Sequence, residues 1–239
     1  MSTTELSKNL ERLKESIEMF YATPSSKTNS KDKVAYFDSK NNTRSLLSDP
    51  GGNVFLIDIL GLQGIRLPEK ITNEIVKDAV NNKNIILLGG GHSAMDLLGD
   101  TEGNLTPKTV TNIDPYITSE YTVKNTKNIY KSITLHAESP ELISELKDQG
   151  IPKADEIWAN WAVPTYSERA EDITSLFENI DVMLAVGGVA RIHPLEMANI
   201  DRDQMFNADD FEKRRDAWVE AVKKLIDTDR YNLDVIEGK

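Results

Sequence analysis

The stretch NIILLGGGHSAMDLLGD, residues 84–100, decides the fold predicted for this chain. Four aliphatic residues, typical of a buried strand, lead into Gly89, Gly90 and Gly91, and a segment compatible with a helix follows. Glycines at a strand end let the backbone approach a ligand closely, and the N-terminus of the next helix offers unpaired N–H groups. A tight strand-to-helix turn that binds nothing produces the same pattern.

Apolar runs alternate with amphipathic stretches after this unit. Further strands are expected at TVTNIDPYI (109–117), SITLHAES (132–139), ADEIWANWAVP (154–164) and, after a glycine turn, VGGVARIHPL (186–195). Helices are expected at SPELISELKDQG (139–150), SERAEDITSLFENID (167–181, capped by Ser167) and NADDFEKRRDAWVEAVKKLID (207–227), with a last strand at RYNLDVIEGK (230–239). This alternation predicts an α/β fold with a doubly wound, mostly parallel Rossmann-like sheet and helices on both faces.

An N-terminal helical extension is expected to precede the sheet. Residues 3–22 place Leu6, Leu10, Leu13, Ile17 and Phe20 at helical spacing, which predicts an amphipathic helix. The run VFLIDILGLQGI (54–65) is too apolar for a linker, and VAYF (34–37) is a candidate strand that would close the sheet. Residues 1–67 are therefore interpreted as a cap or dimer contact, and residues 68–239 as the sheet domain.

Composition narrows the classes of partner. The 239 residues include 28 Lys plus Arg against 39 Asp plus Glu, and the net charge of −11 argues against a nucleic-acid partner. No run of about 18 apolar residues predicts a membrane span. The lack of cysteine excludes disulfides, and with no signal-peptide pattern at the N-terminus it favours a cytoplasmic protein. A small molecule or a basic protein segment is the expected substrate, and a homodimer is possible.

Asp114 ends the second predicted strand, about 20 residues after the glycines. In a doubly wound sheet, ligands bind at the carboxyl ends of the strands, and an acid at this place accepts hydrogen bonds from ribose hydroxyls. The residues alone leave open an adenosine ligand such as S-adenosylmethionine (SAM), a dinucleotide such as NAD, or no ligand. A 2′-phosphate would be repelled by Asp114, which argues against NADP.

The order and spacing of these segments resemble class I SAM-dependent methyltransferases over residues 69–239. NIILLGGGHS is similar to the family's glycine loop, NIDPYI to its second strand, LHAES to its adenine-contacting segment and ADEIWANWAVPTY to its fourth strand. The resemblance implies a methyltransferase-like protein that binds SAM. The cofactor-binding residues it implies are Gly89, Gly90, Gly91, Ser93, Asp114, Ala137, Glu138 and Asn160.

Two alternatives stay open beside the methyltransferase. Leu87 stands where the family usually carries an acid, and Ser93 replaces the third glycine of the common loop. Leu87, together with the family's last strand, which is not evident in the sequence, favours a non-catalytic Rossmann-like binding protein. An NAD-dependent oxidoreductase is the other alternative, because its nucleotide loop has the same glycine pattern.

Side chains near the predicted strand ends are the candidates for chemistry. His193 is a candidate general base and Tyr166 a second catalytic candidate. Trp161 and Tyr166 are expected to line a substrate pocket, whereas Trp158 fits equally well in the core. The three histidines show no metal-ligand spacing, so no metal is expected. Asp155 and Glu156 are interpreted as solvated residues.

Overall fold

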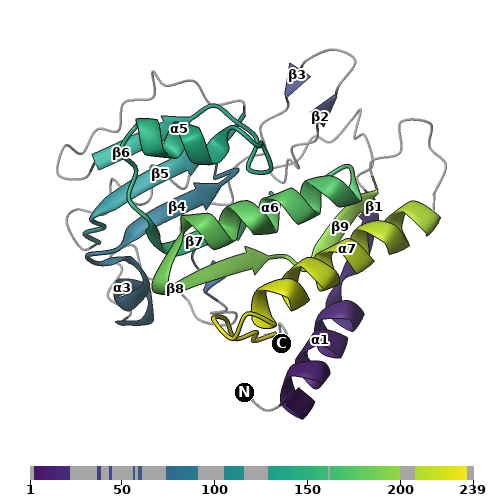
Figure 1. Cartoon of the computed structure of the whole chain (residues 1–239). Helices are drawn as coiled ribbons and strands as arrows, with labels where there is room; N and C mark the ends of the chain where they lie inside the picture. Colours follow the sequence, from purple (N-terminus) through teal and green to yellow (C-terminus); the bar gives the residue numbers. More distant parts are fainter. Residues whose placement is uncertain are drawn as a thin grey trace.

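A five-stranded, all-parallel sheet forms the centre of the protein in the computed structural model (Figure 1). The structure describes residues 3–21, 37–38, 43–44, 56, 59–60, 74–90, 105–115, 129–160, 162–199 and 208–235. The strands, in the spatial order β6-β5-β4-β7-β8, are β4 (Asn84–Leu88), β5 (Thr109–Ile113), β6 (Ile129–Ile133), β7 (Ala154–Asn160) and β8 (Leu184–His193). The chain moves outward from β4 to β6 and then returns to the other side of β4. This order confirms the predicted doubly wound α/β fold.

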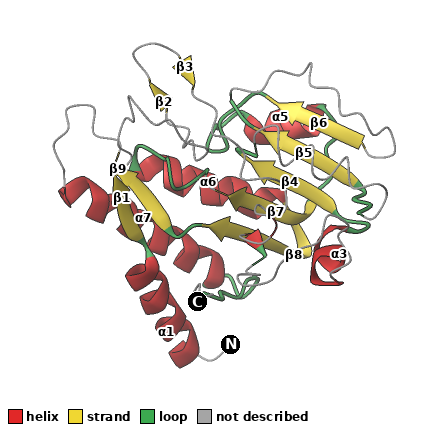
Figure 2. Cartoon of the chain, turned by 180° about the vertical axis from the view of Figure 1, so that it is seen from behind, coloured by secondary structure: helices red, strands yellow, loops and turns green. Residues whose placement is uncertain are grey.

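Two hydrophobic cores cover the two faces of the sheet, because side chains of β4 alternate between them. Ile86 and Leu88 belong to the core built with α5 (Leu142–Asp148), α6 (Ala170–Met183) and α7 (Ala208–Ile226). The alternate residues, Ile85 and Leu87, join the core built with α3 (Glu74–Val80). Figures 1 and 2 show α5 and α6 lying across one face. The expectation of helices on both faces is therefore confirmed.

The N-terminal segment forms a helix and a strand rather than one helix. The helix α1 (Thr3–Ser16) is followed by β1 (Glu18–Tyr21), which pairs in parallel with β9 (Glu196–Asn199). The backbone N–H of Glu18 donates to the Leu195 carbonyl at 3.0 Å, where strand pairing begins. The predicted helix over residues 3–22 is thus too long, because pairing with a distant strand overrides helical periodicity.

The helix α1 docks on α7 and on the segment that follows it. Leu13 and Ile17 are buried in the core that also contains α6 and α7. The Asn9 amide donates to the Leu233 carbonyl at 2.9 Å, and the Arg12 guanidinium donates to the Val235 carbonyl at 3.0 Å. The expected last strand at 230–239 is wrong for its described part: residues 231–235 form no strand, and their carbonyls serve these N-terminal side chains.

Other parts of the extension are described only in pieces. The strands β2 (Phe37–Asp38) and β3 (Thr43–Arg44) form a separate antiparallel pair, so Phe37 of the VAYF run does not join the main sheet. Leu56, Ile59 and Leu60 are buried, as the apolar run 54–65 predicts. The boundary predicted at residue 67 lies outside the described residues. No helix in the described part of the chain is long and apolar enough to cross a membrane.

Three local predictions on the sheet need correction. The strand β6 ends before LHAES, which forms a loop instead. Gly187 and Gly188 lie inside β8 and not before it: Ala154 pairs with Leu184 but Glu156 pairs with Val189, so the extra β8 residues form a bulge. Ser167 does not cap α6, because Arg169 occupies the N-cap position and pairs with Asp172.

Candidate functional site

The predicted site residues that the structure describes lie along the carboxyl edge of the parallel sheet. Each follows or ends a different strand, and parallel strands bring these ends to one side. In spatial order they are Ala137 and Glu138 after β6, Asp114 after β5, Gly89 and Gly90 after β4, Asn160 at the end of β7, and His193 at the end of β8. Gly91, Ser93 and Trp161 lie outside the described residues.

Gly89 and Gly90 are required by contacts within the protein. Gly89 has φ +65°, and a Cβ there would lie 2.6 Å from the Ala162 Cβ. A Cβ on Gly90 would lie 2.8 Å from the Leu87 Cβ and 2.9 Å from the Asn112 Oδ1. These two glycines therefore permit a tight strand end, and the space they create is filled by protein atoms.

Asn112 anchors this strand end from the neighbouring strand. Its Oδ1 accepts a hydrogen bond from the Gly90 N–H at 3.1 Å, and Asn112 itself is fully buried. Sequence reasoning missed this residue. An asparagine, a residue type depleted in strands, two positions before Asp114 in the predicted second strand is the signal that could have indicated it.

Asp114 is also fully buried at the start of the β5 loop. Its backbone N–H donates to the Ile133 carbonyl at 3.0 Å, which extends the pairing of β5 with β6 beyond the strand ends. The backbone that carries the Asp114 carboxylate is therefore held in place beside the end of β6. Asp114 thus lies at the carboxyl end of β5, where the sequence places it, and its role toward a ribose stays a prediction.

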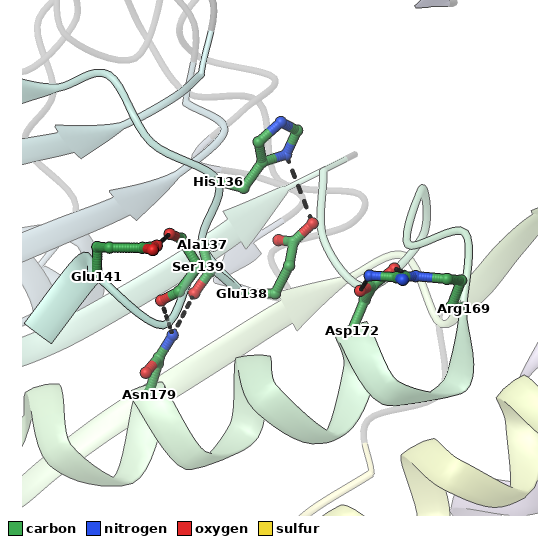
Figure 3. A network of polar contacts seen from close by, with 8 residues as sticks. All are labelled: His136, Ala137, Glu138, Ser139, Glu141, Arg169, Asp172 and Asn179. Carbon is green, nitrogen blue, oxygen red and sulfur yellow. Dashed lines mark hydrogen bonds and ion pairs between the residues drawn. The ribbon is translucent and has the colours of Figure 1, made fainter.

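Glu138 lies on the loop between β6 and α5, within a network of polar contacts (Figure 3). One carboxylate oxygen, Oε1, is 3.5 Å from the His136 Nδ1. The other, Oε2, is buried and has no hydrogen-bond partner among the described residues. Burial raises the pKa of Glu138, and nearby Asp172 raises it further, whereas a hydrogen bond with its own backbone, His136 and Arg169 oppose the shift. An orphaned buried acceptor is costly, and a ligand donor would relieve that cost.

The loop that carries Glu138 is held by Asn179 of α6. The Asn179 Nδ2 donates to the Ala137 carbonyl at 2.9 Å and to the Ser139 carbonyl at 3.1 Å. The loop closes on itself as well, since the Ser139 N–H donates to the His136 carbonyl at 3.0 Å. Sequence reasoning missed Asn179, because its partners lie about 40 positions away in the chain.

Asn160 and His193 lie at the β8 side of the edge, and Tyr166 lies in the loop after β7, where its backbone N–H donates to the Ala162 carbonyl at 3.0 Å. Asn160 and His193 are register partners at the ends of β7 and β8. The Asn160 Oδ1 is buried and has no hydrogen-bond partner among the described residues.

Burial, and then the charge of Glu196, raises the pKa of Tyr166 to about 12. Tyr166 is therefore a neutral phenol at ordinary pH and is suited to donate a hydrogen bond, but not to act as a base.

Two residues of β7 belong to the interior and not to the site. Trp158 is fully buried, and its indole N–H donates to the Glu156 carboxylate at 2.9 Å. Arg191 of β8 pairs with the same carboxylate at 3.0 Å. The interpretation of Glu156 as solvated is wrong, because these two partners let a strand carboxylate remain buried.

Metal ligation finds no support in the described part of the chain, where no three His, Asp or Glu side chains come together as a metal site. No family model and no curated protein matches the sequence. Any functional conclusion therefore depends on the chemistry of the carboxyl edge. That edge presents buried acceptor oxygens at or after the ends of three strands, at Asp114, Glu138 and Asn160, and suits a ligand rich in hydrogen-bond donors.

Proposed function

We propose that this protein binds S-adenosylmethionine at the carboxyl edge of the sheet and transfers its methyl group to a small-molecule or protein acceptor. The observation that carries the proposal is the row of acceptor oxygens at Asp114, Glu138 and Asn160, on both sides of the glycines that follow β4. SAM offers donors that suit such a row: two ribose hydroxyls, the adenine amino group and an ammonium group.

The charge of the edge favours SAM over NAD. Asp114 and Glu138 are acidic, and a dinucleotide would bring a doubly charged pyrophosphate into the same site. SAM instead carries a sulfonium and an ammonium group, which carboxylates attract. The acidic charge of the whole chain acts in the same direction and also favours a neutral or basic acceptor.

The residues of the chain would serve mainly to bind and orient. When bound, SAM supplies an already activated methyl group, so alignment of the acceptor accounts for most of the catalysis required of the protein. His193 is the candidate base for an acceptor that must lose a proton, and Tyr166 is a candidate donor that orients it. The proposal includes a cytoplasmic location, based on the absence of cysteine.

One observation favours a non-catalytic binding protein as the second candidate. Leu87, at the position where the resembling family has an acid, is fully buried in the core that contains α3. It therefore offers no group to the methionine part of SAM. A protein of this kind would bind the cofactor without turning it over.

Calorimetric titration of the full chain with SAM, and separately with NAD, tests the proposal. We expect one-site binding of SAM and no measurable binding of NAD. Binding of NAD alone would favour the oxidoreductase, and absence of both would overturn the proposal. Transfer of a labelled methyl group to a small-molecule and peptide panel then separates the enzyme from the binding protein.

A further inference from the structure

Asn179 occupies a place in α6 where an apolar residue is expected. Leu176 and Met183, each one turn away, and the adjacent Ile180 are all buried. Asn179 is itself only 9% exposed. Asparagine is a weak helix former, and burying its amide is unfavourable unless the amide is hydrogen-bonded. Specific hydrogen bonds of its amide must therefore offset the unfavourable burial of this side chain.

Both hydrogen bonds from its side-chain nitrogen go to the loop between β6 and α5. The acceptors, Ala137 O and Ser139 O, flank Glu138 on either side. Figure 3 shows the Asn179 side chain rising from α6 to these two carbonyls, with the Glu138 side chain directed away toward His136. One amide thus holds the peptide group that precedes Glu138 and the peptide group that follows Ser139, and so restrains the backbone that carries the Glu138 carboxylate.

We propose that Asn179 is a positioning residue that aims Glu138 at the amino group of an adenine base, and so sets the base selectivity of the site. The inference rests on the proposed binding of SAM. The orphaned Oε2 of Glu138 can accept a hydrogen bond from the adenine amino group. Hypoxanthine carries a carbonyl oxygen at the same place, and this second acceptor, with its partial negative charge, would be repelled by the carboxylate. Selectivity of this kind requires that the carboxylate be held, because a free side chain would turn away from the wrong base.

The test compares S-adenosylhomocysteine with S-inosylhomocysteine, which differ at this position of the base. We expect the wild-type chain to prefer the adenine ligand by about tenfold or more, the worth of one hydrogen bond to a charged group. In Asn179→Leu that preference should fall to about threefold or less, because the loop loses both bonds. A merely structural role would weaken both ligands equally and leave the ratio unchanged, which would overturn the inference.

Thr174→Val is the matched control. Thr174 lies on the same helix, and its hydroxyl donates to the Ala170 carbonyl at 3.3 Å, within α6 and away from the loop. This change also removes one side-chain hydrogen bond to backbone, and the base preference should stay at the wild-type value. A loss equal to that of Asn179→Leu would show that any perturbation of α6 suffices, and would overturn the role of Asn179.

Asn179→Asp keeps the inference falsifiable if the leucine variant does not fold. An ionised carboxylate would face two carbonyl oxygens and repel them, whereas a protonated one donates to one of them. Relative to the wild type at each pH, the base preference of this variant should recover as the pH falls from about 8 to about 6. A constant relative preference would contradict the inference. Failure of the wild type to bind S-adenosylhomocysteine is a separate result, which overturns the proposed function and this inference with it.

Discussion

Gly89 and Ala162 are in contact so close that no side chain fits between them. A Cβ on Gly89 would lie 2.6 Å from the Ala162 Cβ, and the backbone of Gly89 has φ +65°. Gly89 directly follows β4, whereas Ala162 lies in the loop after β7. The end of β4 and the loop after β7 are therefore in close contact. This contact lies between β4 and β7, where the strand order reverses, beside the candidate site.

Gly89→Ala should lower the free energy of unfolding more than an alanine substitution at a glycine that has a positive φ but no close neighbour. Gly150→Ala is the control, because Gly150 has φ +62° and no atom within 4 Å of an added Cβ. The control should cost about 1–2 kcal/mol for the left-handed backbone. Gly89→Ala should add about 1–3 kcal/mol for overpacking, measured by urea unfolding. Equal losses in the two variants would contradict the contact with Ala162.

Leu13→Ala should show that the N-terminal helix is part of the main core and not a mobile cover. Leu13 is 3% exposed and belongs to the core that contains α6 and α7. Its truncation should lower the free energy of unfolding by about 2–5 kcal/mol. Leu10→Ala, a partly buried position on the same helix, should lower it less. If both changes are silent in denaturant unfolding, α1 is not docked as described.

Glu196→Gln should stabilise the protein at neutral pH and have little effect in acid. Glu18 and Glu196 are register partners on β1 and β9, and burial, followed by the charge of Glu18, raises the pKa of Glu196. An acid with a raised pKa in the folded state stabilises the fold while it is protonated, and this contribution is lost as the pH rises through that pKa. Removing the charge should therefore raise the free energy of unfolding at pH 7, and the gain should vanish near about pH 4.

Glu178→Gln is the control for this pH dependence, because Glu178 is exposed on α6. It should leave the unfolding free energy nearly unchanged at both pH values. A double variant with Glu18→Gln should gain less than the sum of the two single changes, since either one removes the repulsion. Equal gains for Glu196→Gln at both pH values would argue against a charge effect.

The sheet was predictable because its strands carry their own signals. The strands β4, β5 and β7 are buried along most of their length, as central parallel strands are, and β4 and β5 are followed by a glycine and an acid. Their order along the chain then places Asp114, Glu138, Asn160 and His193 at one edge. The fold and this alignment therefore follow from local pattern and topology together.

Pairings between distant segments were not predictable. The strand β1 continues a helical pattern and becomes extended only because β9 lies beside it. Glu156 is buried because Arg191, on the next strand, pairs with it. Asn179 gains its role from loop carbonyls about 40 positions away. In each case the deciding partner is far away in the sequence, so the local pattern of apolar and polar residues does not predict the contact.

Calorimetric titration of Asp114→Asn with SAM tests the central claim most directly. The substitution keeps the shape of a buried side chain but removes its charge, and Asp155→Asn is the control. Asp155 accepts from the Asn84 N–H at 2.8 Å, at the opposite, amino-terminal edge of the sheet. We predict that the wild type and the control bind SAM alike, and that Asp114→Asn binds at least about tenfold more weakly while its circular dichroism spectrum stays native. Equal affinity in all three proteins would contradict the account.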